Sequence, residues 1–195
     1  MILTAQCSYA QSRTILVLGD SLSAAYGIPT EQGWVPLLQA ELKQLYPCYQ
    51  IVNASQSGMT TQQGISQLAK ALESTNPEIT ILELGANDGL RGQSPANMKQ
   101  NLQAMISKLK ARGSKILLVG IYLPPNYGKI YIDRFQNVYT EIAKEYELQF
   151  LPFMLEGIVG NPQLFQADQL HPTSDAQPII QLNIFTALKP ILEQC

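Results

Sequence analysis

The sequence has few charged residues, and they are not clustered. Charged residues make up 14% of the 195 positions, and the formal net charge is −2. No run of lysines and arginines occurs, so we expect no nucleic-acid partner. No apolar stretch approaches the roughly 20 residues that a helix needs to cross a bilayer, so we expect no stable membrane insertion.

Nucleotide and metal motifs are also missing. Neither G-x-G-x-x-G nor G-x-x-x-x-G-K-[ST] occurs, which argues against a dinucleotide or nucleotide enzyme. The three cysteines, Cys7, Cys48 and Cys195, do not have the spacing of metal ligands. We therefore expect no metal and no other cofactor.

Histidine is almost absent: the chain has one, His171, in the stretch "ADQLHP". A single imidazole can simply pack in the core or face water. Its neighbours in sequence, Asp168 and Pro172, make a functional role worth testing against the rest of the chain.

What is present is an ordinary globular composition. Apolar residues make up 46% of the chain, enough for a sizeable core in one domain. We place this domain at residues 14–195. Residues 1–13, "MILTAQCSYAQSR", fit neither a strand nor a helix.

The first 13 residues leave two interpretations open. Small residues at 8–10 suit a signal-peptidase site, although a basic start and a longer apolar run are missing. If the segment is the remnant of an export signal, the protein is periplasmic or secreted, and cleavage after Ala10 leaves an even pair of cysteines, which suits an oxidising compartment. If it is a native flexible arm, the protein is cytoplasmic.

Apolar runs alternate with helical patterns along the whole domain. Runs that are apolar on both faces predict buried parallel strands, and amphipathic segments between them predict helices on both sides of the sheet. The sequence therefore predicts a three-layer α/β/α fold. We expect strands at 13–19, 49–55, 78–85, 114–122 and 148–151, and helices at 33–47, 60–75, 94–113, 131–147 and 173–194.

Four polar motifs follow the predicted strands. They are "GDSLS", "SQSG" and "GANDG" after the first three strands, and "ADQLHP" after the fifth. Because the C-terminal ends of parallel strands share one edge of a sheet, we expect these motifs to meet there, where ligands bind in such folds.

Three of these residues can form a nucleophile with its base. Ser21 lies at a strand-to-helix turn, and His171 is the only conventional base available to it. Asp168, three residues before His171, can hold the imidazole through Nδ1. The alternatives are a helix cap for Ser21 and a solvated loop carboxylate for Asp168. The lipase motif G-x-S-x-G is absent, because Ser23 stands at the second glycine.

An acyl-transfer site also needs hydrogen-bond donors for the oxyanion. Gly58 can offer its N–H without a side chain in the way, and Asn87 can offer its amide. With the Ser21 N–H they make three donors. Gly58 and Asn87 could instead be ordinary turn residues.

At this point the sequence resembles the SGNH, or GDSL, hydrolase family. The segments "LGDSLSAAYG", "NASQSGMTTQQG", "ELGANDGLRG" and "DQLHPTSDAQP" are similar to its four signature blocks. "LPPNYG" and "LPFMLEGI" further resemble the bacterial periplasmic members that act as thioesterase, arylesterase and lysophospholipase.

The resemblance implies both fold and mechanism. It implies a flavodoxin-like, five-stranded parallel sheet of order 2-1-3-4-5. It implies that Ser21, His171 and Asp168 are nucleophile, base and orienter, and that Ser21, Gly58 and Asn87 form the oxyanion hole. The expected function is hydrolysis of acyl esters and thioesters through an acyl-enzyme on Ser21, in a monomer acting on small molecules.

Substrate contacts are harder to assign. Met59 replaces the polar residue usual after the second-block glycine, and Arg91 could meet an anionic leaving group or be a surface arginine. We hypothesise that residues 121–131 wall an apolar acyl groove, against the alternative of a well-packed surface loop. The candidate substrate-binding residues are Met59, Arg91, Ile121, Leu123 and Tyr127.

The implied strand order also bears on the cysteines. It puts the first and last helices on one face, both ending opposite the site. Cys48 and Cys195 follow these helices, so they could come within disulfide reach; the alternative is unrelated free thiols.

Two rival functions stay open. A carbohydrate O-deacetylase would use the same catalytic residues on acetyl esters. A non-catalytic phosphate- or flavin-binding protein could use "GDSLS" as an anion cradle, but that leaves "DQLHP" without a role.

Overall fold

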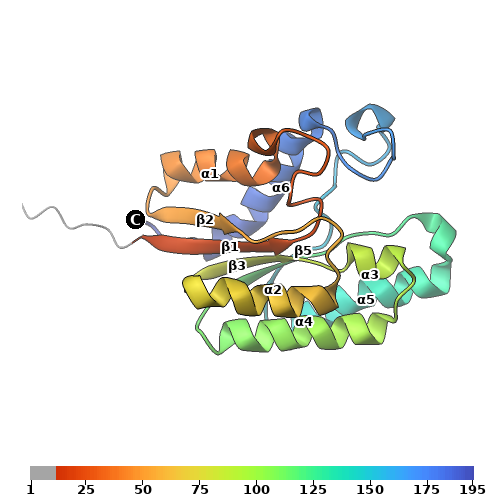
Figure 1. Ribbon diagram of the computed structural model, residues 1–195, viewed down its shortest axis with the longest axis horizontal. Coiled ribbons are helices and arrows are strands. Elements are labelled where there is room, and N and C mark those ends of the chain that lie inside the picture. Colours follow the sequence, from red (N-terminus) through yellow and green to blue (C-terminus); the bar gives the residue numbers. More distant parts are fainter. Residues whose placement is uncertain (1–11) are drawn as a thin grey trace, which may run out of the picture.

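The computed structural model describes residues 12–195, which fold around one five-stranded parallel sheet (Figure 1). The strand order is β2-β1-β3-β4-β5, as predicted. All neighbouring strands pair in parallel. The strands are β1 (Arg13–Gly19), β2 (Tyr49–Asn53), β3 (Ile79–Glu83), β4 (Lys115–Val119) and β5 (Gln149–Leu151).

Helices cover both faces of the sheet and complete the three layers. Helices α1 and α6 pack together on one face, while α4 lies between α2 and α5 on the other (Figure 1). The α-helices are α1 (Trp34–Leu45), α2 (Thr61–Ser74), α3 (Ala86–Leu90), α4 (Pro95–Lys110), α5 (Lys129–Glu145) and α6 (Gln177–Leu188). Short 3₁₀ turns are η1 (Thr30–Gln32), η2 (Pro125–Tyr127), η3 (Pro162–Leu164), η4 (Ser174–Ala176) and η5 (Lys189–Ile191).

The core forms where the predicted strands are apolar on both faces. Every residue of β3 is buried, and so are Ile15, Leu16 and Leu18 of β1. Burial of such side chains stabilises the fold by about 1.5–3 kcal/mol each relative to exposure. The sheet is therefore a rigid support for the loops at its C-terminal edge.

Two helices differ from expectation. The five residues of α3 form a helix that begins within "GANDG" and ends at Leu90, a segment too short to show helical periodicity. The predicted last helix, 173–194, is shorter at both ends: residues 174–176 form the 3₁₀ turn η4, and α6 ends at Leu188 and continues only as the 3₁₀ turn η5. Pro190 has no N–H to continue the α-helical hydrogen bonds, which explains the change after Leu188.

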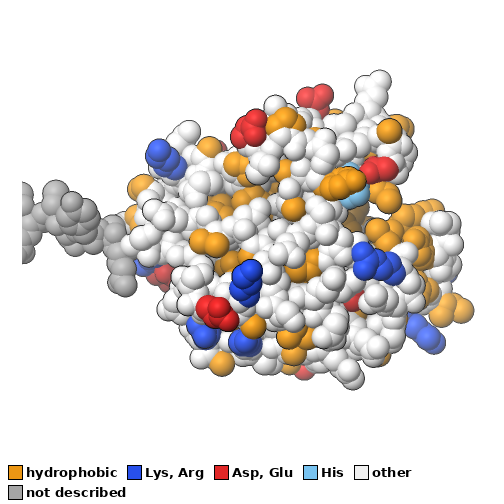
Figure 2. All heavy atoms as spheres, viewed as in Figure 1, with side chains coloured by type: hydrophobic (Ala, Val, Ile, Leu, Met, Phe, Trp, Pro, Cys, Tyr) orange, Lys and Arg blue, Asp and Glu red, His pale blue; other side chains and the backbone are white. Residues whose placement is uncertain are grey.

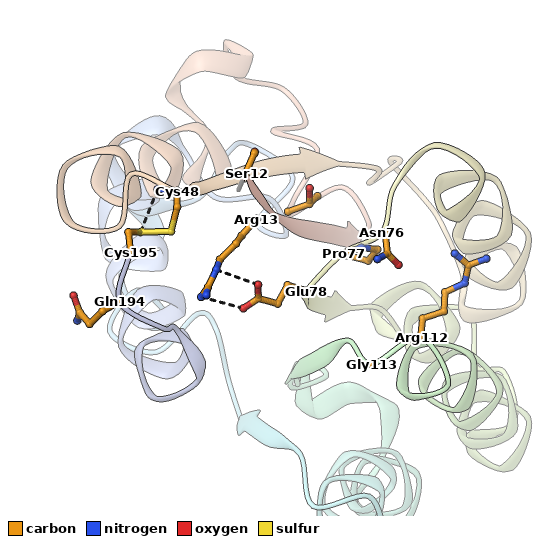
Figure 3. A pocket seen from close by; sticks show the side chains of 11 residues that line it. Ser12, Arg13, Cys48, Asn76, Pro77, Glu78, Arg112, Gly113, Gln194 and Cys195 are labelled. Atoms are coloured by element: carbon orange, nitrogen blue, oxygen red, sulfur yellow. Dashed lines mark hydrogen bonds and ion pairs between the residues drawn. A yellow bond between two sulfur atoms is a disulfide. The ribbon is translucent and has the colours of Figure 1, made fainter. Parts of the chain in front are cut away.

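The N-terminal ends of the strands hold a second feature, remote from the predicted site. Cys48 and Cys195 are joined by a disulfide with a Cα–Cα distance of 5.7 Å, which confirms their predicted proximity. They border an open cavity of about 500 Å³ together with Arg13 and Glu78 (Figure 3). Arg13 is already the first residue of β1, while residues 1–11 of the expected arm lie outside the described residues.

No helix of residues 12–195 is long and apolar enough to span a membrane.

Candidate active site

The four polar motifs meet at the C-terminal edge of the sheet, as predicted. Ser21 follows β1, Gly58 follows β2 and Asn87 follows β3 within α3, while Asp168 and His171 come from the loop between β5 and α6. The chain's single histidine, pale blue in Figure 2, lies at the surface beside hydrophobic and acidic side chains. Residues from both ends of the chain therefore share one site.

Ser21, His171 and Asp168 form one hydrogen-bonded series. The Ser21 Oγ lies 2.9 Å from His171 Nε2, and His171 Nδ1 lies 2.6 Å from Asp168 Oδ2. The first distance is that of an ordinary hydrogen bond, and the second is that of a short bond to a charged carboxylate. In this geometry His171 can accept the Ser21 proton at Nε2 while Asp168 fixes the opposite ring nitrogen.

The Asp168 carboxylate is held by the turn that it begins. Its Oδ1 accepts the backbone N–H groups of Leu170 at 2.9 Å and His171 at 3.0 Å. Gln169 adopts the left-handed conformation, with φ of 56°, which closes the turn. Burial raises the pKa of Asp168, but the hydrogen bonds from His171 and Leu170 outweigh it and lower that pKa to about 2. The carboxylate is therefore charged at neutral pH.

Two backbone N–H groups are available for an oxyanion. The N–H groups of Ser21 and Gly58 donate to no acceptor within residues 12–195. Gly58 has φ of +76° in a turn closed by the Met59 N–H on the Gln56 carbonyl, so a side chain at position 58 would be strained. The local turn thus leaves the Gly58 N–H unpaired beside the site.

Asn87 is held close to these donors, but its amide is already in use. Its Nδ2 donates to Asp20 Oδ2 at 3.0 Å and to the Met59 carbonyl at 3.2 Å. Both amide hydrogens are therefore engaged at rest. Donation to an oxyanion requires one of these bonds to be shared or exchanged.

Asp20 and Glu83 form a buried carboxyl pair below the Ser21 turn. Burial raises the pKa of Asp20 to about 6, against hydrogen bonds from Leu22 and Asn87 that lower it. Glu83 Oε2 accepts the Ser23 hydroxyl at 2.7 Å and the Asp20 N–H at 3.2 Å. Burial and the charge of Asp20 raise the pKa of Glu83 well above its usual range.

Sequence reasoning missed Glu83 as part of this site. The available signal was one acidic residue at the end of a strand otherwise made of apolar residues and threonine. Asp88 was also missed: it accepts the Thr61 N–H at 2.8 Å and the Thr61 hydroxyl at 2.6 Å. Through these bonds Asp88 ties α3, and with it Asn87, to the start of α2.

The candidate substrate-binding residues do not form one surface. Met59, Ile121 and Leu123 are buried in the hydrophobic core, so they offer little area to an acyl chain. The Tyr127 hydroxyl donates to the Leu90 carbonyl at 2.8 Å. Residues 121 and 123 therefore fit the alternative of a well-packed loop better than the hypothesis of an apolar groove.

Arg91 is the exception among these residues. Its side chain is exposed, and Nη2 donates to the Gly58 carbonyl at 3.0 Å. A cation therefore lies against the carbonyl side of the Gly58 turn.

The fold and this geometry define a class of protein. A serine hydroxyl, an imidazole and a carboxylate in series, beside unpaired N–H groups, are the arrangement of a serine hydrolase that transfers acyl groups.

Comparison with known proteins agrees with this class. Residues 17–177 match the GDSL-like Lipase/Acylhydrolase family. The chain is 47% identical over 183 residues to Esterase TesA of Pseudomonas aeruginosa, covering 94% of this chain and 91% of that protein. It is 39% identical to Thioesterase 1/protease 1/lysophospholipase L1 of Escherichia coli K12, covering 94% and 86%.

A solved structure is similar over nearly the whole fold. The psychrotrophic esterase EstA from Pseudoalteromonas sp., inhibited by monoethylphosphonate, matches with a TM-score of 0.87 and 40% identity, covering 92% of this chain and 98% of that one. The chain therefore belongs to the GDSL-like lipase/acylhydrolase family, and its class is that of the carboxylic ester hydrolases.

Proposed function

We propose that the protein hydrolyses acyl esters and thioesters through an acyl-enzyme on Ser21. The observation that carries this proposal is the hydrogen-bonded series from Ser21 through His171 to Asp168. The relatives named as esterase and as thioesterase/lysophospholipase support this substrate range.

The reaction begins at the Ser21 hydroxyl. Its Oγ attacks the carbonyl carbon while His171 Nε2 takes the hydroxyl proton. The Asp168 carboxylate stabilises the imidazolium that forms. The tetrahedral intermediate then collapses, and His171 protonates the departing alcohol or thiol. Water repeats the sequence on the acyl-enzyme, which releases the acid and restores Ser21.

The oxyanion is stabilised by donors on three elements. The N–H groups of Ser21 and Gly58 are unpaired within the described chain and can bind the oxyanion directly. Asn87 contributes by sharing a hydrogen that now bonds to Met59 or Asp20. Arg91 adds positive charge beside the Gly58 turn, which favours substrates with an anionic leaving group.

Substitution of Ser21 tests the mechanism. The Ser21→Ala variant should lose on the order of 10⁶ in kcat on a p-nitrophenyl ester. An organophosphonate, whose tetrahedral phosphorus mimics the intermediate, should add one equivalent to the wild type, located at Ser21 by mass spectrometry. Near-normal turnover by Ser21→Ala, or an adduct on another residue, would contradict the assignment.

A substrate panel tests the specificity. It contains p-nitrophenyl esters of increasing acyl length, an acyl-CoA, a lysophospholipid and an acetylated sugar, each with Ser21→Ala as control. Hydrolysis of the longer acyl esters and the thioester supports the proposal. Preference for acetyl groups alone would instead identify a carbohydrate O-deacetylase.

We also propose that the protein works in the periplasm or outside the cell. The Cys48–Cys195 disulfide supports this, because structural disulfides persist in oxidising compartments. When intact cells are alkylated before lysis, Cys48 and Cys195 should stay unmodified because they are bonded to each other. The protein should be recovered in the periplasmic or secreted fraction. Free thiols in a cytoplasmic fraction would contradict the proposal.

A further inference from the structure

The nucleophile and its base come from segments that the chain does not connect locally. Ser21 lies in the segment 21–27 and His171 in the loop 164–172, and 150 positions separate the two residues. Their contact depends on whatever holds these two segments together. A displacement of about 1 Å between reacting groups can cost roughly 100-fold in rate.

One side chain bonds to both segments. The Gln166 amide nitrogen donates to the Tyr26 carbonyl at 2.8 Å and to the Pro172 carbonyl at 3.0 Å. Apart from the Ser21–His171 contact itself, the bond to Tyr26 is the only hydrogen bond between the two segments in the described part of the chain. Gln166 thus uses both amide hydrogens to link them.

The backbone of Gln166 also braces the turn that carries the base. Its N–H donates to the His171 carbonyl at 2.7 Å, and its carbonyl accepts the Gln169 N–H at 2.9 Å. An isolated antiparallel bridge between Phe165 and Pro172 closes the same loop. A shift of Gln166 would therefore move the Asp168–His171 turn with it.

On the other side, Tyr26 connects this bond to both reacting residues. The Tyr26 N–H donates to the Ser21 carbonyl at 3.2 Å, and its ring packs on the His171 imidazole with 4.5 Å between centroids. Gly27 allows this close approach, because a Cβ at position 27 would clash with Gln166 Oε1; the φ of Gly27 is +75°, which also favours glycine.

We propose that Gln166 is a positioning residue that, together with the Tyr26 ring, sets the distance between Ser21 Oγ and His171 Nε2. The proposal rests on the proposed function, since it concerns the efficiency of the same acyl transfer. Within residues 12–195 the Gln166 side chain makes no hydrogen bond to Ser21 or to the imidazole, so we infer that it acts through the backbone positions of Tyr26, His171 and Pro172.

The test compares Gln166→Ala with Gln163→Ala. Gln163 is exposed in η3, directly before this loop, and its side chain makes no hydrogen bond within residues 12–195, so Gln163→Ala should keep wild-type kinetics. Gln166→Ala should lower kcat by roughly 10–100-fold with KM unchanged within about twofold. The rate of phosphonylation at Ser21 should fall by the same factor, while the melting temperature of the variant shows that it is folded.

Two further variants separate positioning from general disruption. Gln166→Glu keeps the shape but cannot donate, so it should lose as much activity as Gln166→Ala. In a His171→Ala background, Gln166→Ala should cause no further loss in the residual rate, because its effect passes through the imidazole.

Three results would each overturn the proposal. They are a wild-type kcat in Gln166→Ala, full activity in Gln166→Glu, and a loss from Gln166→Ala in the His171→Ala background that equals its loss in the wild-type background. These results are distinct from failure of the proposed function, which would show as activity in Ser21→Ala.

Discussion

Cys48 and Cys195 are bonded across a sequence separation of 147 residues, at the opposite end of the sheet from Ser21. The bond fixes the C-terminal residue to the start of β2. At the same end of the sheet, Glu193 forms ion pairs with Arg13 and Lys115. These bonds tie the last residues of the sequence to β1, β2 and β4 at the end of the sheet that is remote from Ser21.

Loss of the disulfide should lower stability without changing catalysis. Loop-closure entropy for a separation of 147 residues gives at most about 5 kcal/mol. We expect the double variant Cys48→Ser/Cys195→Ser to unfold at lower urea concentration while keeping wild-type kcat at 25 °C. Equal unfolding midpoints for the variant and the oxidised wild type would show that the bond adds no stability.

Removal of the Asn87 amide should slow the reaction rather than unfold the protein. Asn87→Ala is expected to lose roughly 10²–10³ in kcat, the usual effect of one oxyanion donor. The bond to Asp20 is lost as well, so the melting temperature must be measured alongside kinetics on a p-nitrophenyl ester. A matched control is Asn101→Ala, which removes an amide that bonds to Thr61 away from the reacting atoms. A wild-type kcat in Asn87→Ala would exclude this residue from the oxyanion hole.

The buried Asp20 should make stability depend on pH. Its pKa rises from 3.8 to about 6 on folding, so the folded state binds more protons than the unfolded state between these values. The contribution of Asp20 to stability is therefore largest below a pH of about 4 and is lost as the pH rises to about 6, a change of about 3 kcal/mol. The low pKa of Asp168 has the opposite effect, but below that window.

Comparison with Asp20→Asn isolates this contribution. The decline in unfolding free energy between pH of about 4 and about 7 should be smaller in the variant, since asparagine does not titrate. Urea unfolding at several pH values measures it. Parallel pH curves for wild type and variant would show that Asp20 has an ordinary pKa in the folded protein.

Glu83 should tolerate a neutral isostere but not truncation. Because burial raises its pKa well above the usual range, Glu83→Gln removes a charge that folding already opposes, and it retains an acceptor for Ser23 and the Asp20 N–H. Glu83→Ala leaves both donors unpaired and a cavity below the Ser21 turn. We expect it to cost about 3 kcal/mol or more in unfolding free energy. Equal losses in the two variants would contradict this interpretation.

The elements of the fold were predictable because their patterns are local. The apolar runs of β1 and β3 and the helical spacing in α1 and α2 depend only on neighbouring residues. The capping box of Thr60 and Gln63 fixes the start of α2 in the same way. The short helix α3 was missed because five residues show no helical periodicity, and the break after Leu188 was missed because it depends on Pro190 alone.

Some side chains were placed wrongly from the sequence because long-range packing determines whether they face a groove or the core. Ile121 and Leu123 follow β4 and were expected to border a groove, yet both side chains turn into the core. A Cβ on Gly89 would lie 2.6 Å from Leu123, which shows how closely α3 packs on it. No periodicity in a loop reveals which side chains point inward.

The sequence alone determined which residues could perform the chemistry: one histidine leaves one base, and motifs at strand ends of a parallel sheet must share an edge. The tertiary structure decided how they meet. The 2.9 Å contact of Ser21 with His171, the engaged amide of Asn87 and the link through Gln166 all join positions more than 25 residues apart. Local patterns encode which face of an element is buried, whereas the distance between two loops depends on the packing of the whole sheet and its helices.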